Sequence, residues 1–539
     1  LVAVAVYART RSSVPALTHD ALDNLLAIEG GGAALYHPHH LAFGAVSWVW
    51  LRLLRAAGVD GDPLLDVALL NSVLGGVCVA LAHVLLRVRA ALPAPLALAG
   101  AAGAGLSFGV WFYSGNVEVY VLPLALLLAA LLAATAPRPT AWTATAAGAL
   151  HGLAVLGHQV HVLFAAVLLV ALVRRGADRG QLARYLGTAA AVVVAGYGLV
   201  LGLVVRPSSP GAAVDWATSY AQERSYWYPP GRSTLPDAAI GFGRAVIGGH
   251  FAFRLDNVRE QVVGRFPGKS LADEAFLVRR LDAAGTVVLL AAALVAAALL
   301  VGVLVTGARR LRTLPAPARG LVPPLVTLLG VYGLVFLFWE PWNPEFWIPQ
   351  ATALWLLAAT LSAPRVRAGP GGRRLDRPAA ALAASAVLVG VVNLAGSIVP
   401  ATDPGNDVYA VRYGALAPLV GPGDLVVVDR PHLGVGYATR LTDATPVPAT
   451  TFSTSVDPDR PAPADLPDDV LARVDRALAD GHRVAVDPEL VTRPSNPEAA
   501  RTGRELRVAH GDRWRAVRAD NGVRWLVIDP PDQPPARKL

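Results

Sequence analysis

The stretch Ala283–Thr306 reads AAGTVVLLAAALVAAALLVGVLVT and contains no charged residue. A second stretch, Pro378–Pro400, is also free of charged residues. Each is long enough to cross the hydrocarbon core of a bilayer, roughly 30 Å thick, as one α-helix. The sequence therefore predicts an integral membrane protein.

The composition of the whole chain agrees with this prediction. Of the 539 residues, 54% are hydrophobic and 16% are charged, whereas soluble domains have about a quarter of their residues charged. The net charge of +8 comes almost entirely from arginine, which is typical of the cytoplasmic loops of membrane proteins. We therefore expect membrane lipids, and no nucleic acid, as partners. The single cysteine, Cys78, excludes a disulfide framework within one chain.

We predict an α-helical polytopic protein with about eleven membrane-spanning helices. The run Leu1–Ala8 is too short to span and is expected to be the end of a first helix that starts outside the sequence. The complete spans are predicted at 64–86, 94–112, 117–135, 142–157, 159–173, 184–205, 283–306, 321–338, 346–363 and 380–399.

The stretch 38–57 decides the orientation. It is apolar, but Arg52 and Arg55 interrupt it. If it crossed the membrane, the arginine clusters of the later loops would lie outside, against the positive-inside rule. A juxtamembrane helix at 38–57 places these clusters and the N-terminus in the cytoplasm. The segments that then face outward are 9–63, 113–116, 206–282, 339–345 and everything after residue 400.

The C-terminal part of the chain differs in kind, because residues 401–539 contain no segment that could span a membrane. Short buried strands are predicted at Leu425–Asp429 and Arg483–Asp487, with an amphipathic helix at Asp468–Ala479 between them. The sequence therefore predicts a transmembrane domain at 1–400 and a small extracytoplasmic α/β domain at 401–539.

The first outward loop contains both acids and histidines. Asp20 and Asp23 would share one face of a helix, where a carboxylate can act as a general base toward a hydroxyl, or one of them caps a short helix. Imidazoles are common metal ligands, but neighbouring histidines do not share a helix face. For His37, His39 and His40 we therefore predict substrate contact or interfacial packing and no metal site.

Other candidate residues lie at later outward turns. Glu118 is the single acid where two predicted spans meet, and an acid at membrane depth is either functional or bonded to loop backbone. Tyr120 and His158 lie at such turns as well, where an interfacial anchor or a structural histidine is the alternative. Glu340 and Glu345 stand among tryptophans and prolines, a composition suited to stacking on sugar rings or to anchoring at the interface.

The long outward loop 206–282 mixes aromatic residues with arginines, among them Arg224 and Arg232. A guanidinium binds phosphate through two hydrogen bonds, so the loop suits an anionic lipid head group. An ordinary solvated loop with interfacial anchors is the alternative.

Taken in order, these motifs resemble the membrane-embedded glycosyltransferases of the GT-C superfamily. The branch resembled is that of protein O-mannosyltransferases and their uncharacterised bacterial relatives. The resemblance covers roughly residues 1–400 in architecture and mainly 18–165 in motifs. The motifs are the acids of the first outward loop, the following His-Pro, Asn71-Ser72, the run Trp-Phe-Tyr-Ser-Gly-Asn-Val-Glu-Val-Tyr at 111–120 and Gly-Leu-Ala-Val-Leu-Gly-His at 152–158.

The resemblance implies transfer of a sugar, mannose or similar, from a polyprenyl-phosphate-linked donor to an extracytoplasmic glycan, lipid or protein acceptor. It implies Asp20 as the base, with Asp23 as the fallback, and Glu118 as the acid of the second outward turn. A divalent cation such as Mg²⁺ or Mn²⁺ is compatible with the sequence but is not required by it. The chain departs from the family pattern with Asp20-x-x-Asp23 for Asp-x-x-Glu and with His37-Pro38-His39 for His-Pro-Pro.

The alternative function is that of a membrane transporter or lipid flippase without glycosyl transfer. A transporter is expected to carry ionisable residues in broken helices at mid-membrane. The acids of this chain cluster at the predicted outer surface instead, which favours the enzyme.

Overall fold

The computed structural model describes residues 1–18, 20–222, 226–265, 272–364, 377–450, 466–492, 494–518 and 522–530. The chain forms two compact units. Unit 1 comprises Leu1–Ser12, Ala27–Ser209 and Tyr220–Thr402, and unit 2 comprises Ser13–Leu26, Pro210–Ser219 and Asp403–Leu539. Two helices, α2 (Ala21–Gly30) and α11 (Pro210–Gln222), contribute residues to both units.

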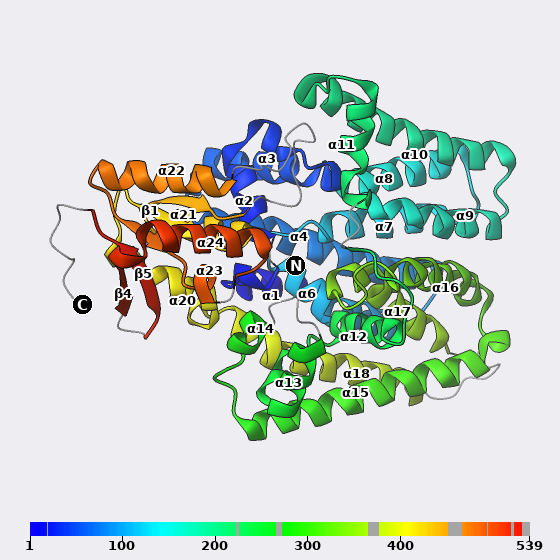
Figure 1. Ribbon diagram of the computed structural model, residues 1–539. Helices are drawn as coiled ribbons and strands as arrows, with labels where there is room; N and C mark the ends of the chain where they lie inside the picture. The colour runs from blue at the N-terminus through cyan, green and yellow to red at the C-terminus, as the bar shows by residue number, and fades with distance from the viewer. Residues whose placement is uncertain are drawn as a thin grey trace. The chain divides into compact units, whose positions relative to one another are not determined.

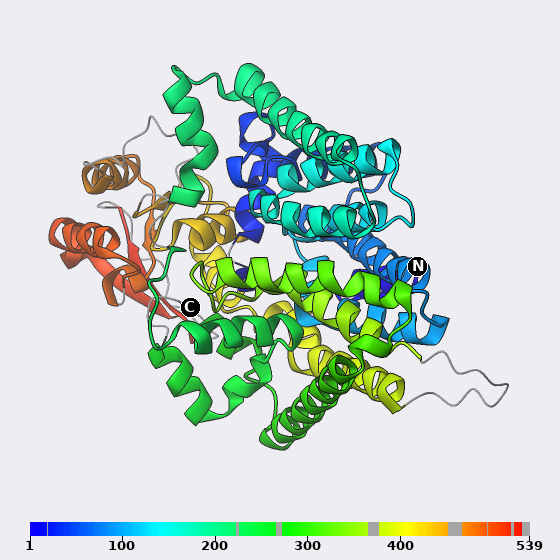
Figure 2. The ribbon, with the colours of Figure 1, turned by 90° about the vertical axis from the view of Figure 1, so that its right-hand side faces the viewer.

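Unit 1 is helical, and its long apolar helices pack side by side, α8 against α10 and α15 against α18 (Figures 1 and 2). Its helices are α1 (Val2–Arg9), α3 (Phe43–Ala56), α4 (Pro63–Val84), α5 (Ala94–Leu106), α6 (Phe108–Ser114), α7 (Val121–Ala134), α8 (Ala141–Gly157), α9 (Phe164–Arg174), α10 (Arg179–Val200), α12 (Thr234–Val246), α13 (Asp256–Arg265), α14 (Ala272–Leu277), α15 (Ala283–Arg309), α16 (Ala316–Phe336), α17 (Ile348–Leu361), α18 (Arg377–Asn393) and α19 (Val399–Ala401).

The described residues contain five helices that are long and apolar enough to cross a membrane, or six if the bent pair α5 and α6 counts as one span. The five are Pro63–Val88, Arg179–Val205, Ala283–Arg309, Ala316–Phe336 and Arg377–Ala401. The chain is thus a multi-pass membrane protein, as predicted. The other predicted spans are also helical and correspond to α7, α8, α9 and α17. Each of these helices has fewer than the 18 residues required here of a membrane-crossing helix. The number of crossings and their orientation therefore stay predictions.

The segment 94–112, expected as one straight span, is broken. The helices α5 and α6 meet at an angle of 65°. Ser107 lies between them in an extended conformation, and its hydroxyl accepts a hydrogen bond of 2.8 Å from the Trp355 indole. Asn393 donates to the carbonyl of Leu106 at 2.8 Å. The break is therefore satisfied by side chains that lie far away in the sequence.

Glycines allow the closest helix contacts in unit 1. A Cβ atom at Gly75 of α4 would lie 2.1 Å from the Ser114 hydroxyl of α6. A Cβ atom at Gly148 of α8 would lie 2.4 Å from the Tyr185 carbonyl of α10. Small residues at such contacts let helix backbones approach closely, which is how membrane helices associate in the absence of a hydrophobic driving force.

Unit 2 contains a five-stranded sheet in the order β2-β1-β3-β5-β4. The strands are β1 (Leu425–Val428), β2 (Thr445–Pro448), β3 (Val484–Val486), β4 (Trp514–Arg518) and β5 (Arg524–Ile528). β1 is parallel to both β2 and β3, and β5 is antiparallel to β3 and β4. The expected strands at 425–429 and 483–487 are confirmed as β1 and β3, whose continuous apolar runs are typical of strands buried on both faces.

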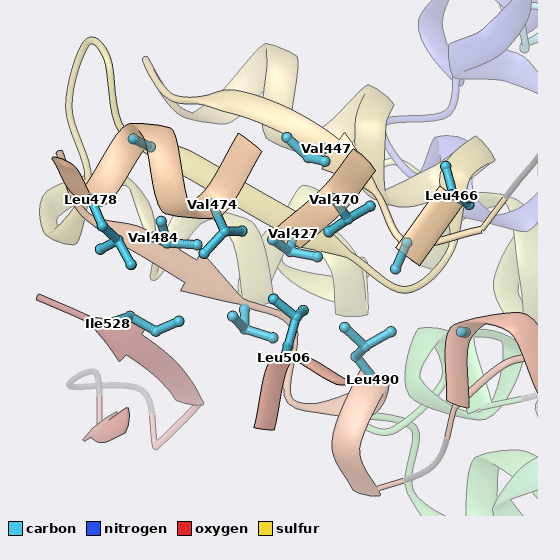
Figure 3. Packing of buried hydrophobic residues seen from close by; sticks show 14 residues of the cluster. Val427, Val447, Leu466, Val470, Val474, Leu478, Val484, Leu490, Leu506 and Ile528 are labelled. Atoms are coloured by element: carbon cyan, nitrogen blue, oxygen red, sulfur yellow. The ribbon is translucent and has the colours of Figure 1, made fainter. Parts of the chain in front are cut away.

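The core of unit 2 lies between the sheet and the helix α22 (Leu466–Ala479), as Figure 3 shows. Four of the buried residues of α22 are spaced four positions apart, namely Leu466, Val470, Val474 and Leu478. Residues at this spacing lie on one face of a helix, and here that face covers β1 and β3. The amphipathic helix expected at 468–479 is confirmed and begins two residues earlier. The helix α24 (Pro497–His510) adds Leu506 to the same core.

A buried ionic group lies at the carboxyl end of β3. Asp487 follows this strand, and its side chain is 4% exposed. Its carboxylate lies 3.5 Å from the Arg412 guanidinium and accepts a hydrogen bond of 3.3 Å from the Tyr413 hydroxyl. Arg412 also contacts Glu489 at 2.6 Å. Burial raises the pKa of Asp487 from 3.8 to about 6, Glu489 and Asp429 add to this shift, and Arg412 opposes it.

This shift predicts how the stability of unit 2 depends on pH. Because Asp487 holds its proton more tightly in the folded unit, its contribution to stability is fully present below pH 3.8 and is lost as the pH rises through about 6. The contribution amounts to roughly 3 kcal/mol at most. Replacing Asp487 by Asn should flatten the decline in hydrogen-exchange protection of the β1 and β3 amides over this pH range, after correction for intrinsic exchange rates. The exposed Asp469→Asn variant is the control and should keep the wild-type slope, whereas an unchanged slope in Asp487→Asn would contradict the assignment.

Candidate active site

The turn between α6 and α7 carries Glu118 and is held by α4. The amide of Asn71 donates to the carbonyls of Asn116 and Glu118, both at 2.7 Å. The neighbouring Ser72 donates to the carbonyl of Ser114 at 2.9 Å. Two adjacent polar residues of one helix thus fix a non-helical turn, and Glu118 is 1% exposed there.

Tyr113 connects this turn with the loop after α16. Its hydroxyl donates to the Glu345 carboxylate at 3.2 Å. Glu118, Glu345 and Arg244 are the charged groups that act on this hydroxyl. Glu345 is thus the hydrogen-bond acceptor of this buried phenol, and the charges of Glu118 and Arg244, from two other segments, also act on it.

Asn343 organises the two carboxylates of the loop. Its amide donates to Glu345 at 2.7 Å and to Glu340 at 3.1 Å. Glu340 is 5% exposed and adopts a left-handed backbone conformation with φ of 38°. A non-glycine residue in this conformation is strained and persists only where its surroundings fix it. The surroundings fix Glu340 in this way, because its backbone N–H donates to the Tyr226 carbonyl at 3.1 Å.

The long segment 206–282 pairs with the same loop. Trp227 and Trp339 form an antiparallel bridge, and the Tyr228 N–H donates to the Phe338 carbonyl at 2.7 Å. The Tyr228 ring packs against that of Trp342, with ring centroids 4.3 Å apart. Burial, with a smaller contribution from the Glu340 carboxylate, raises the pKa of Tyr228 to about 12. The aromatic residues predicted to anchor the two loops thus pack against each other beside a carboxylate.

His158 ends α8 and is 1% exposed. Among the residues that the structure describes, neither of its ring nitrogens has a hydrogen-bond partner. Its ring centroid lies 4.0 Å from that of His39 and 5.4 Å from that of Tyr120. A buried imidazole that lacks partners is costly, so a ligand group is a natural partner for it.

The predicted histidines form one cluster next to His158. The His37 and His40 rings stack at 4.4 Å, and the Nδ1 atom of His37 accepts from the His39 N–H at 3.2 Å. Burial lowers the pKa of His37 to about 4 and lowers those of His39 and His40 well below 6.5. These three histidines are therefore neutral at pH 7. Within the described ranges, no group of three or more His, Cys, Asp or Glu side chains could hold a metal ion.

A second ionic group includes residues that the sequence-based prediction did not select. Arg244 of α12 contacts the Glu274 carboxylate of α14 at 2.6 Å, and His250 lies 3.7 Å from the same carboxylate. His250 also shares a hydrogen bond of 2.9 Å with Ser397. Only the composition of the long loop indicated Arg244, and no local motif marks Glu274 or Asn343.

The other predicted residues are Asp20, Asp23, Arg224 and Arg232. Asp20 is exposed and directly precedes α2, and its carbonyl accepts the first helical hydrogen bond, 2.8 Å from the N–H of Asn24. Asp23 lies in the first turn of α2 and is half-buried. Both acids belong to unit 2, whereas Glu118 belongs to unit 1. Arg232 is exposed, and Arg224 lies outside the described residues.

The fold as a whole is similar to that of ArnT. The crystal structure of ArnT from Cupriavidus metallidurans in the apo state matches with a TM-score of 0.57 at 14% identity, over 98% of this chain and 96% of that one. The structure of the same protein bound to undecaprenyl phosphate matches with a TM-score of 0.55 at 13% identity, over 99% and 97% of the two chains. No family model and no curated protein sequence matches the chain. The predicted α-helical polytopic fold with a small α/β region is confirmed, while the GT-C superfamily and its O-mannosyltransferase branch stay predictions.

The two hydrogen bonds from Asn71 to the α6–α7 turn lead to a prediction about stability. Replacing Asn71 by Ala leaves two buried carbonyls without their amide donor and should cost roughly 2–4 kcal/mol. Thermal unfolding of the purified protein in detergent measures this as a lower Tm. The matched control is Asn116→Ala, because the Phe112 carbonyl that Asn116 contacts also accepts from the Gly115 N–H at 3.0 Å. Equal losses of Tm in the two variants would contradict the inference that Asn71 fixes the α6–α7 turn.

Proposed function

We propose that the protein is an integral membrane glycosyltransferase that moves a sugar from a polyprenyl-phosphate-linked donor to an extracytoplasmic acceptor. The observation that carries this proposal is the likeness of fold over nearly the whole chain to ArnT, one structure of which is bound to undecaprenyl phosphate. The buried carboxylate of Glu118 and the half-buried one of Glu345 support it, because ionisable groups held inside a protein are typical of functional sites. The sugar is mannose or a similar hexose, and the acceptor is a glycan, a lipid or a protein.

The proposed reaction is a single displacement at the anomeric carbon. An acceptor hydroxyl attacks this carbon, the bond from the carbon to the phosphate oxygen breaks, and the polyprenyl phosphate leaves as an anion. The hydroxyl proton passes to a carboxylate acting as general base. Asp20 is the first candidate for the base, and Asp23 and Glu118 are the alternatives. No step requires a metal ion, although Mg²⁺ or Mn²⁺ could assist the departure of the phosphate.

Residues of unit 1 would bind the donor. His158 offers two ring nitrogens to sugar hydroxyls, and Tyr120 beside it offers an aromatic face. Glu345 and Glu340 accept hydrogen bonds and can receive further hydroxyl groups. His37, His39 and His40 shape the surroundings of His158 as neutral side chains. Arg224, Arg232 and Arg244 would supply positive charge for the phosphate, since an oxyanion is best stabilised by preorganised donors.

The break between α5 and α6 is the observation that favours the alternative function, because transporters build their binding sites from broken helices. In this chain the break is closed by hydrogen bonds from Trp355 and Asn393, and neither residue is ionisable. A transporter site would leave a backbone group such as the Leu106 carbonyl, to which Asn393 donates here, open to an ion or substrate. The break therefore supports the enzyme more than the transporter.

The assignment of the base can be tested by transfer from radiolabelled polyprenyl-phosphate sugars in membranes that contain the full-length protein. Asp20→Asn should lower the rate by at least roughly 100-fold, the usual contribution of a general base. The control is Asp60→Asn, an exposed acid of the same predicted outward loop, which should keep the wild-type rate. Loss of transfer in Glu118→Gln with Asp20→Asn still active would move the base to Glu118. Absence of transfer from every donor, in protein shown to be folded, would favour the transporter.

The hydrogen bond between Tyr113 and Glu345 gives a second prediction. Tyr113→Phe removes a hydrogen bond to the charged Glu345 side chain. Because the Glu345 carboxylate then loses a partner that fixes its position, kcat/KM should fall by roughly 10- to 100-fold. Glu345→Gln should have an effect of similar size, and the double variant should lose little more than either single one. Tyr185→Phe is the matched control, because its buried hydroxyl bonds His151 on α8 and takes no part in the proposed site. Fully additive losses in the double variant would show that the two residues act separately.

A further inference from the structure

The sheet of unit 2 has a point at which the strand order reverses. From β1 the chain passes to β2 on one side, and from β2 it crosses to β3 on the other side of β1. In open sheets with parallel strands, ligands bind outside the carboxyl ends of the two strands that flank such a point. Here the two strands are β1 and β3, and the residues that follow them are Asp429 and Asp487.

Asp429 is 0% exposed, and only one of its two carboxylate oxygens has a hydrogen-bond partner among the described residues. One oxygen, Oδ1, accepts from the Ser495 N–H at 3.0 Å. The other oxygen, Oδ2, is buried and has no hydrogen-bond donor among the described residues. A buried acceptor without a donor lowers the stability of the fold. We therefore expect a ligand or an ordered water to supply a donor.

A buried donor that also lacks a hydrogen bond lies at the same edge of the sheet. The Nη1 atom of Arg412 makes no hydrogen bond within the described residues, although the Asp487 carboxylate lies 3.5 Å away. Arg412 comes from the helix α20 (Val408–Gly414) and is fixed there by Glu489 at 2.6 Å. The Asp487 N–H donates to the carbonyl of Val427 at 2.9 Å, two residues before Asp429, so Asp429, Asp487 and Arg412 lie at one edge of the sheet.

Two charged side chains of the cluster are partly exposed to solvent. The side chains of Glu489 and Arg430 are 29% and 30% exposed and lie 4.0 Å apart. Asp487 and Arg412 lie deeper, with side chains 4% and 18% exposed. A ligand would thus pass two partly exposed charged side chains before it meets the buried donor and acceptor.

The chemistry of the cluster selects a class of ligand. Arg412 pairs with two of its carboxylates, and no group of three or more His, Cys, Asp or Glu side chains within the described residues could hold a metal ion. The three carboxylates of Asp429, Asp487 and Glu489 outnumber the guanidinium groups of Arg412 and Arg430, so the cluster has no excess of positive charge that would hold an anion. A hydroxyl group both donates and accepts, so two neighbouring hydroxyls can satisfy one free acceptor and one free donor together.

The geometry points to a sugar-binding site at the carboxyl ends of β1 and β3. One hydroxyl of a neighbouring pair donates to Oδ2 of Asp429, and the other accepts from Nη1 of Arg412. This inference goes beyond the proposed transfer reaction, because none of the residues proposed for transfer takes part in it. The site would give unit 2 a role of its own in holding a glycan.

The test uses the full-length protein in lipid nanodiscs without any polyprenyl donor, so a failed transfer reaction cannot affect it. Saturation-transfer NMR is recorded with the methyl glycosides of mannose, glucose and galactose. Tetrahydropyran-2-methanol, a similar ring without neighbouring hydroxyls, is the control ligand. We expect at least one glycoside to bind with saturation and the control ligand to give no saturable signal.

Variants then locate the site. Asp429→Asn replaces the free acceptor by a donor and should weaken binding by roughly 10-fold or more. Asp424→Asn is the matched control, because Asp424 precedes the amino end of the same strand and accepts from the Arg483 N–H at 2.7 Å. In the wild-type protein, the bound glycoside should also slow hydrogen exchange at residues 429–430 and 487–489, a readout that does not depend on the folding of any variant.

Three results would overturn the proposal. The first is that no glycoside binds, or that tetrahydropyran-2-methanol binds equally well. The second is glycoside binding that leaves exchange at residues 429–430 and 487–489 unchanged. The third is protection of these amides by Mg²⁺ alone, which would make the cluster a cation site.

Discussion

A backbone that crosses hydrocarbon must satisfy every amide and carbonyl from within the protein, because no water is present to do so. In unit 1 this constraint acts most strongly where the helices are interrupted. The Asn393 amide donates a hydrogen bond to the carbonyl of Leu106 at the end of α5, and the Asn71 amide donates to two carbonyls of the turn after α6. Both are buried amides with 0% exposure. The break before α6, the helix that carries Tyr113, and the turn after α6, which carries Glu118, depend on these two side chains.

This arrangement explains why the polar groups of the candidate site can be buried. Once the turn after α6 is fixed, Tyr113 reaches the Glu345 carboxylate from a position 232 residues earlier in the chain. Asn343 then joins Glu345 to Glu340, and the strained backbone of Glu340 is held by the segment at Tyr226. Each polar group has its position set by a neighbour, so the site is preorganised and not assembled from mobile loops.

Sequence patterns predicted the local features of the fold. Uninterrupted apolar length identified the membrane helices, and short apolar runs identified β1 and β3, because both patterns act within a few residues. The break at Ser107 was missed, because it depends on Trp355 and Asn393, which no local pattern connects with it. The acids and histidines of the loops that were predicted to face outward were found as single residues, but their partners were not. Asn343, Arg244 and Glu274 matter through long-range contacts that one sequence cannot reveal.

The charges near the candidate site set a condition for binding an anionic donor. The histidines at positions 37, 39 and 40 are neutral, because burial lowers their pKa values well below 7. Arg244 is already paired with Glu274 at 2.6 Å, and both side chains are less than one-fifth exposed. A phosphate that approached Arg244 would therefore have to compete with a carboxylate of the same sign. Either Glu274 moves away when the donor binds, or the phosphate is held by exposed guanidinium groups such as that of Arg232. In the first case donor binding is coupled to a shift of α14, whereas in the second the ion pair only supports the fold.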